Sequence, residues 1–387
     1  MLFELDCELE DYLKPSFDTQ SGVWKVYGFD DVSSILCNLE TTVADASKNL
    51  SILQTRANID LHALVKVMNG FLIFQNTIVH ARGRDFLKAG LLKHFGRLTS
   101  RAIKGHISTV LSAIPHGQEI DVISQVCNKI PMYVMGNLLG LEEKTRDEIG
   151  VLNESLFKLI SPRQRISEYI TGNLIADQAI ELIARNATSN KQSEVLGNWF
   201  FIGQNTYGLS RSEISALLLF LFIVGVEETA AFLGNTLLIL LTKTEVLQPH
   251  HLNVNYHQNC INEMLRYCGP IRSLPYRFFS KPMSFRGVEI PANSPIECNI
   301  ELAHFDPIAF DEPSVFNPRR IGYKPIVFGG GLHGCLGRRL AYLETTLLLE
   351  ELALGFRMTS KNITPQWDNV NTSLRKQKEL RLMLIPY

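Results

Sequence analysis

The part of the sequence best suited to metal chemistry surrounds one cysteine, Cys335. Residues 328–337 read Phe-Gly-Gly-Gly-Leu-His-Gly-Cys-Leu-Gly, so the thiol follows a glycine-rich run and stands at the entrance of an apolar helical stretch. A helix N-terminus favours a thiolate, and a bound metal favours it further. Glycines let a loop approach a flat macrocycle where a Cβ atom would collide. Apolar neighbours such as Phe328 and Leu336 keep water from the sulfur, so this run suits a metal-thiolate site.

Two other interpretations of the same run stay open. Gly329, Gly331 and Gly334 match the GxGxxG pattern of dinucleotide-binding turns. A dinucleotide-binding fold needs alternating strands and helices around that turn, whereas proline-broken coil precedes this one. The run also fits a glycine-rich turn that buries an ordinary core cysteine.

Two adjacent acids, Glu227 and Glu228, are followed by Thr229 inside an apolar segment whose periodicity predicts a helix over 214–241. About 28 residues at about 1.5 Å each span about 42 Å, enough to cross a whole domain. Carboxyl groups inside an apolar helix are costly unless they are used, which makes these residues functional candidates. A solvated or salt-bridged turn is the alternative.

Two further pairs have the spacing of neighbours on one helix face. His80 and Arg84 are four residues apart, and Glu263 and Arg266 are three apart. On their own, such pairs are typical of exposed helix surfaces.

The elements that position these residues are expected to be helices in the first part of the sequence and mainly coil and small strands in the second. Helical periodicity dominates from about residue 60 to residue 267. Between residues 270 and 325, nine prolines break the chain into coil and small strands, such as 283–290 and 294–298. A last long helix is predicted over about 336–354, followed by a hairpin. The fold class is therefore mainly α with a small β region, and the lack of repeats or linkers favours one domain over 1–387.

Composition excludes several classes of partner. Lys plus Arg number 38 against 39 for Asp plus Glu, so no global attraction to nucleic acid or to an anionic membrane is expected. The acidic stretch 1–13 is unlike a secretory signal, and the apolar run 214–226 is too short to span a membrane. Seven cysteines without a CxxC pair suit reduced thiols. We expect a cytoplasmic protein.

The cysteine run resembles the haem-binding signature of cytochromes P450. Phe328, Gly331, Cys335 and Gly337 stand in the register Phe-x-x-Gly-x-x-x-Cys-x-Gly. The resemblance implies that Cys335 is the axial ligand of the haem iron, with Phe328, Gly329 and Gly337 in the loop that holds the haem. It also implies that His333 lies near a haem propionate.

Other segments resemble the family in order along the chain. Glu263 and Arg266 match its Glu-x-x-Arg, and Arg320 matches the arginine that completes that network to support the cysteine loop. The run 225–229 resembles its small-Gly-x-acid-Thr signature, which gives Glu228 and Thr229 the acid and alcohol roles in oxygen activation. Two residues depart from that signature: Val226 stands where the family usually has glycine, and Ala230 stands where it commonly has a second hydroxyl.

The resemblance also assigns residues to the haem propionates. His80 and Arg84 match a His-x-x-x-Arg found in many bacterial members, and Arg277 in Leu-Pro-Tyr-Arg matches another such arginine. Cations with hydrogen-bond donors are what paired carboxylates need. A histidine that often precedes the cysteine loop is replaced by Pro325, beside Lys324.

The implied protein is a soluble, bacterial-type haem-thiolate monooxygenase, with haem b between the 214–241 helix and the cysteine loop. It would use O2 and hydroxylate a small to mid-sized, largely apolar substrate, of the kind met in secondary metabolism. No flavin or nicotinamide domain is evident, so NAD(P)H electrons would arrive through a separate ferredoxin-type donor and its reductase. A basic patch near the cysteine side, to which that donor would bind, is expected from these residues: Lys88, Lys93, Arg97, Arg101, Lys104, Arg338 and Arg339. Ordinary solvated charge on helix surfaces is the alternative.

Two alternatives belong to other functional classes. One keeps haem-thiolate binding but performs another oxidation, such as epoxidation, coupling or nitration, which product analysis would decide. The other is a non-catalytic haem-binding protein. The presence of both Glu228 and Thr229 argues against it.

Overall fold

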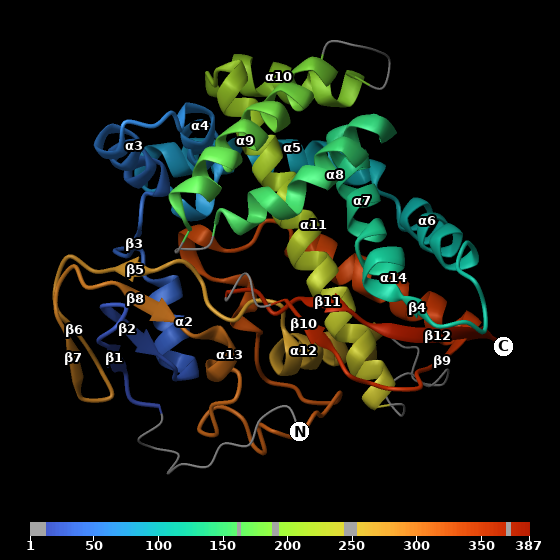
Figure 1. Cartoon of the computed structure of the whole chain (residues 1–387). Helices are drawn as coiled ribbons and strands as arrows, with labels where there is room; N and C mark the ends of the chain where they lie inside the picture. The colour runs from blue at the N-terminus through green and yellow to red at the C-terminus, as the bar shows by residue number, and fades with distance from the viewer. Residues whose placement is uncertain (1–12, 161–163, 188–192, 244–253, 369–372) are drawn as a thin grey trace. The chain divides into compact units, whose positions relative to one another are not determined.

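A computed structural model describes residues 13–160, 164–187, 193–243, 254–368 and 373–387. The chain divides into two compact units. One contains residues 45–230, and the other contains residues 1–44 and 231–387. We call them the helical unit and the mixed unit, and Figure 1 shows the elements of both.

The helical unit is built almost wholly from helices, as the apolar periodicity predicted. Its helices are α3 (Ala46–Ala57), α4 (His62–Gly70), α5 (Thr77–His94), α6 (Ser100–Ser112), α7 (Lys129–Leu139), α8 (Glu143–Lys158), α9 (Ile166–Asn186) and α10 (Ser193–Tyr207). Short 3-10 turns η1 (Leu72–Phe74) and η2 (Phe95–Arg97), a π turn η3 (Ile123–Cys127) and the short strand β4 (Ile120–Asp121) connect them.

Close approach between helices fixes the packing of this unit. A Cβ atom at Gly90 would lie 1.9 Å from the ring of Trp199, so α5 and α10 meet where only a glycine fits. Trp199 is fully buried there. Helices α4 and α8 both pack on α9, as Figure 1 shows.

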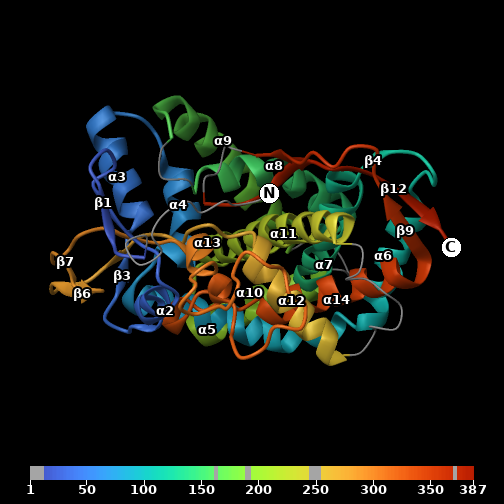
Figure 2. The same ribbon diagram turned by 90° about the horizontal axis from the view of Figure 1, so that it is seen from below.

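In the described part of the chain, the strands of the mixed unit belong to four small sheets. The largest has the order β1-β2-β8-β5-β3, in which β2 and β8 are parallel and the other pairs antiparallel. Figure 2 shows β9 and β12 side by side, in register from Phe356 opposite Pro386. The strands are β1 (Ser16–Asp18), β2 (Val23–Val26), β3 (Thr42–Val43), β5 (Arg277–Phe278), β6 (Met283–Phe285), β7 (Val288–Ile290), β8 (Ile296–Cys298), β9 (Phe356–Thr359), β10 (Gln366–Trp367), β11 (Gln377–Glu379) and β12 (Arg381–Pro386).

The helices of the mixed unit carry the cysteine loop and its supports. They are α2 (Phe29–Cys37), α12 (Val254–Cys268), α13 (Ile300–Ala303) and α14 (Arg338–Gly355), with the 3-10 turns η6 (Ile326–Phe328) and η7 (Gly331–His333). The expected last helix begins two residues later than predicted, because Gly337 is its N-cap. The predicted C-terminal hairpin corresponds to the antiparallel pair β10 and β11.

Helix α11 (Arg211–Thr242) has 32 residues and continues through Glu227 and Glu228. At about 1.5 Å per residue it is about 48 Å long. By length and composition it is the one described helix that could cross a membrane, but 78% of its most apolar window is buried inside the protein. A core helix of a globular protein has this pattern, and the fold is mainly α with a small β region, as predicted.

Candidate functional site

The cysteine loop is a tight turn closed by one backbone hydrogen bond. The amide N–H of Cys335 donates to the carbonyl oxygen of Phe328 over 2.9 Å. Gly329 and Gly331 have φ of 64° and 55°, a left-handed conformation that side chains other than glycine rarely adopt. The turn places Cys335 exposed, just before the first turn of α14.

The sequence suggested that the glycines of the loop face a flat macrocycle. The structure shows that two of them face α2 instead. A Cβ atom at Gly330 would lie 2.7 Å from the sulfur of Cys37, and one at Gly331 would lie 2.9 Å from the carbonyl oxygen of Leu36. These two glycines therefore let the loop press against α2. At Gly337 the nearest atom to a Cβ would be the sulfur of Cys335, at 3.8 Å. A Cβ atom at Gly337 would therefore meet no close contact, and the role of this glycine beside a haem stays a prediction.

Phe328 is held in place by a stack of side chains. The guanidinium carbon of Arg338 lies 5.4 Å from the centre of the Phe328 ring and 5.7 Å from that of Tyr342. The two rings are 5.6 Å apart. Phe328 thus has a fixed position at the start of the loop.

Glu263 and Arg266 of α12 form a fully buried ion pair. Arg266 donates to both carboxylate oxygens at 2.8 Å, and Arg320 approaches the same carboxylate at 3.3 Å. The hydroxyl of Tyr323 and the amide N–H of Asn317 donate to it over 3.1 and 2.8 Å. The network predicted from the three charged residues is confirmed, and an exposed surface pair is excluded.

His304 is a support that sequence reasoning missed. Its Nε2 accepts a hydrogen bond of 3.1 Å from the amide N–H of Ile326, the first residue of η6. Burial, with the nearby Arg266 cation, lowers the pKa of His304 to about 3, so the imidazole is neutral and can accept. Its own carbonyl oxygen accepts from Arg266 at 2.8 Å. No spacing pattern in the sequence singles out this residue.

Arg277, on β5, is a buried cation whose surroundings suit an anionic ligand. Its side chain is 3% exposed, and burial lowers the pKa of the guanidinium. Among the described residues its one hydrogen-bond acceptor is the carbonyl oxygen of Pro275, at 2.6 Å. A carboxylate such as a haem propionate would supply the missing countercharge. His333, on η7, is half-buried, and Lys324 is exposed.

His80 and Arg84 share one face of α5, as their spacing predicted. His80 is 4% exposed and Arg84 is half-buried, so this is not a surface pair. Burial lowers the pKa of His80, and the charge of Arg84 adds to the shift. His80 is therefore a neutral donor or acceptor beside a cation, which fits a carboxylate of the ligand.

Glu228 and Thr229 lie inside α11. Burial raises the pKa of Glu228 to about 7, although part of its side chain remains accessible. Thr229 is 8% exposed, and Ala230 beside it is buried. Glu227 is buried too, and its carboxylate accepts from the Asn153 amide over 2.7 Å. A solvated turn, the alternative for these acids, is excluded.

The predicted site residues fall into two groups, one in each unit. The mixed unit contains the cysteine loop, the buried ion pair and Arg277, and the helical unit contains His80, Arg84, Glu228 and Thr229. The residues of the expected basic patch are exposed, except the half-buried Lys104.

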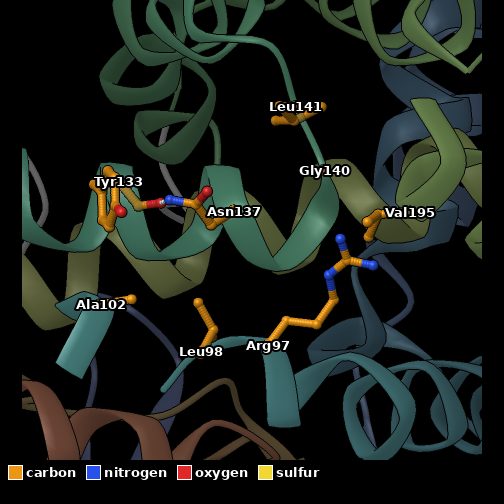
Figure 3. Close-up of a pocket in the computed structure, with 8 residues that line it drawn as sticks. All are labelled: Arg97, Leu98, Ala102, Tyr133, Asn137, Gly140, Leu141 and Val195. Carbon is orange, nitrogen blue, oxygen red and sulfur yellow. Dashed lines mark hydrogen bonds between the residues drawn. The ribbon is translucent and has the colours of Figure 1, made fainter. Parts of the chain in front are cut away.

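A hollow of about 330 Å³ in the helical unit contains none of the predicted catalytic or haem-binding residues. Figure 3 shows Arg97 reaching toward Val195 and Gly140, with Tyr133 and Asn137 on α7. The remaining lining residues are Leu98, Ala102 and Leu141.

The sequence profile of the family Cytochrome P450 matches residues 132–384. A "biotin biosynthesis cytochrome P450" of Bacillus subtilis is 25% identical over 351 residues, which cover 88% of this chain and 84% of that protein. The 6-deoxyerythronolide B hydroxylase of Saccharopolyspora erythraea is 24% identical over 344 residues, with the same coverage.

Solved structures share the fold over almost the whole chain. P450BioI, crystallised with hexadec-9Z-enoic acid ligated acyl carrier protein, aligns with a TM-score of 0.83 at 22% identity, covering 97% of this chain and 96% of that one. CalO2 aligns with a TM-score of 0.85 at 19% identity, covering 98% and 94%.

Proposed function

Because the chain belongs to the cytochrome P450 family and is a monooxygenase, we propose that it hydroxylates a small to mid-sized, largely apolar organic substrate with Cys335 as the axial ligand of haem b. The observation that carries this proposal is the geometry of the cysteine loop. Left-handed glycines and the bond from Cys335 to Phe328 present an exposed thiol at the start of α14. The haem supplies dioxygen activation and oxidation of a substrate C–H bond.

The residues that would hold the haem fit its chemistry. Arg277 is a buried cation without a carboxylate partner among the described residues, and we assign it to a propionate, together with His80, Arg84 and His333. Phe328, Gly329 and Gly337 line the loop on either side of the thiol. The expectation of a single domain over 1–387, with haem between the 214–241 helix and the loop 328–337, stays part of this proposal.

Glu228 and Thr229 would manage the protons that the reaction consumes. A carboxyl with a pKa of about 7 is protonated and deprotonated to similar extents near neutral pH, which suits a group that takes and gives protons repeatedly. The Thr229 hydroxyl would donate a hydrogen bond and order a water molecule. Ala230 has no hydroxyl, so it could not replace the Thr229 hydroxyl in this role.

Electrons would come from NAD(P)H through a separate ferredoxin-type donor and its reductase. The exposed cations Lys88, Lys93, Arg97 and Arg101 of the helical unit would attract an acidic donor. Arg338 and Arg339 are exposed on α14. We further propose a cytoplasmic location, without membrane or nucleic-acid partners, and a place in secondary metabolism.

The test is the absorption spectrum of the purified protein. We expect a red protein whose reduced carbon monoxide complex has the strongly red-shifted Soret band of thiolate ligation. Cys335→Ala should lose that band, while Cys127→Ala, at a buried cysteine, should keep it. A normal thiolate spectrum in Cys335→Ala would refute the assignment. Screening a metabolite library for a change of haem spin state then identifies the substrate.

A further inference from the structure

Helix α8 buries an amide within its apolar face. Asn153 is 2% exposed and lies among Ile149, Leu156 and Phe157, which are also buried. Its Nδ2 donates to Oε1 of Glu227 over 2.7 Å. Glu227 is itself 6% exposed, so a hydrogen bond between two buried side chains joins α8 to α11.

A gain in folding stability does not explain why Asn153 and Glu227 are buried together. The Oδ1 atom of Asn153 is buried and has no hydrogen-bond partner among the described residues. A buried acceptor without a donor costs free energy, and so does a buried carboxyl group. Apolar residues of similar volume often replace buried polar pairs without loss of stability. An aliphatic residue at position 153 would extend the apolar face of α8.

The hydrogen bond acts on the turn of α11 that precedes Glu228 and Thr229. Successive residues of an α-helix are rotated by about 100°, so holding the Glu227 side chain also sets the directions of the next two side chains. A second contact acts on the same turn, because a Cβ atom at Gly225 would lie 2.7 Å from the sulfur of Met135 on α7. Helices α7 and α8 thus both contact this turn.

We propose that Asn153 is a positioning residue, whose hydrogen bond to Glu227 holds α11 at the rotation in which Glu228 and Thr229 deliver protons. This inference rests on the proposed function. It assigns Asn153 no contact with the substrate or the haem. Losing the bond should therefore leave haem binding intact and reduce the efficiency of proton delivery.

Cleavage of cumene hydroperoxide tests the proposal without the natural substrate or a redox partner. Heterolytic cleavage of its O–O bond gives cumyl alcohol, and homolytic cleavage gives acetophenone, so the product ratio reports proton delivery. The variants are Asn153→Leu, Asn153→Leu with Glu227→Leu, and Glu227→Gln, whose side-chain oxygen can still accept from Asn153. Ile149→Ala, one turn earlier on the same buried face, is the control for loosened packing.

We expect the ratio of cumyl alcohol to acetophenone to fall about two-fold or more in both variants that lack Asn153, toward the value of Thr229→Ala. Glu227→Gln should retain the wild-type ratio, and Ile149→Ala should lower the Tm without changing the ratio. A wild-type ratio in the haem-loaded double variant would overturn the proposal, as would an equal fall in Ile149→Ala. Failure of the wild-type protein to form a thiolate complex would instead refute the proposed function.

Discussion

Replacing Glu263 with alanine should destabilise the protein by about 3–5 kcal/mol, because removal of one member of a buried ion pair leaves the other charge without its partner. The Glu263 and Arg266 side chains are both fully buried, and the carboxylate accepts two hydrogen bonds of 2.8 Å from Arg266. Arg320 and Tyr323 lose an acceptor at the same time. We expect the loss of stability to lie at the lower end of this range, because Arg266 keeps carbonyl partners such as His304.

This loss is a large part of the free energy of unfolding of a typical domain, which is about 5–15 kcal/mol. The network also supports the segment that leads to Cys335, since His304 accepts from Ile326 and is held by Arg266. We therefore expect Glu263→Ala, and likewise Arg266→Ala, to yield little or no haem-loaded protein.

The assay combines urea unfolding with haem content per chain. Glu143→Ala is the matched control, because Glu143 pairs with Arg146 at the same i,i+3 spacing but its side chain is 83% exposed. An exposed pair contributes about 0–1 kcal/mol, so the control should unfold almost like the wild type. Normal haem loading and an unchanged urea midpoint in both Glu263→Ala and Arg266→Ala would refute this reasoning.

Three further predictions concern Thr229, Glu228 and Gly330. Thr229→Ala should keep haem binding but divert electrons from product to hydrogen peroxide, measured as product per NAD(P)H with the identified substrate and a competent donor. An unchanged ratio would leave Glu228 and water to carry the protons alone. The pKa of Glu228 is raised by burial from 4.5 to about 7. Its charged form therefore destabilises the fold above pH 7, and this cost disappears as the pH falls to about 4.5. Glu228→Gln should thus raise the Tm more at pH 8 than at pH 4.5, and equal shifts would contradict the assignment. Gly330→Ala should lower stability by about 1–3 kcal/mol, because its Cβ meets the Cys37 sulfur at 2.7 Å. Adding Cys37→Ala should restore part of the loss in a double-mutant cycle, and strict additivity would show that the two residues do not interact.

The sequence predicted the features that depend on local patterns. Apolar periodicity placed α11 within three residues of its observed start and one residue of its observed end. The glycine-rich run placed Cys335 before a helix, and the i,i+3 spacing brought Glu263 and Arg266 together. Each of these rests on helix geometry or turn chemistry, which act over a few residues.

Tertiary structure decided which of those residues are buried and what they contact. The same i,i+3 spacing leaves Glu143 exposed beside Arg146 but buries both Glu263 and Arg266, because residues 304–323 of the mixed unit contact the α12 pair. His304 became a support of that loop through a contact 22 residues away along the chain. Asn153 met Glu227 across 74 residues. Such contacts depend on how helices pack together, and no pattern within a single segment encodes them.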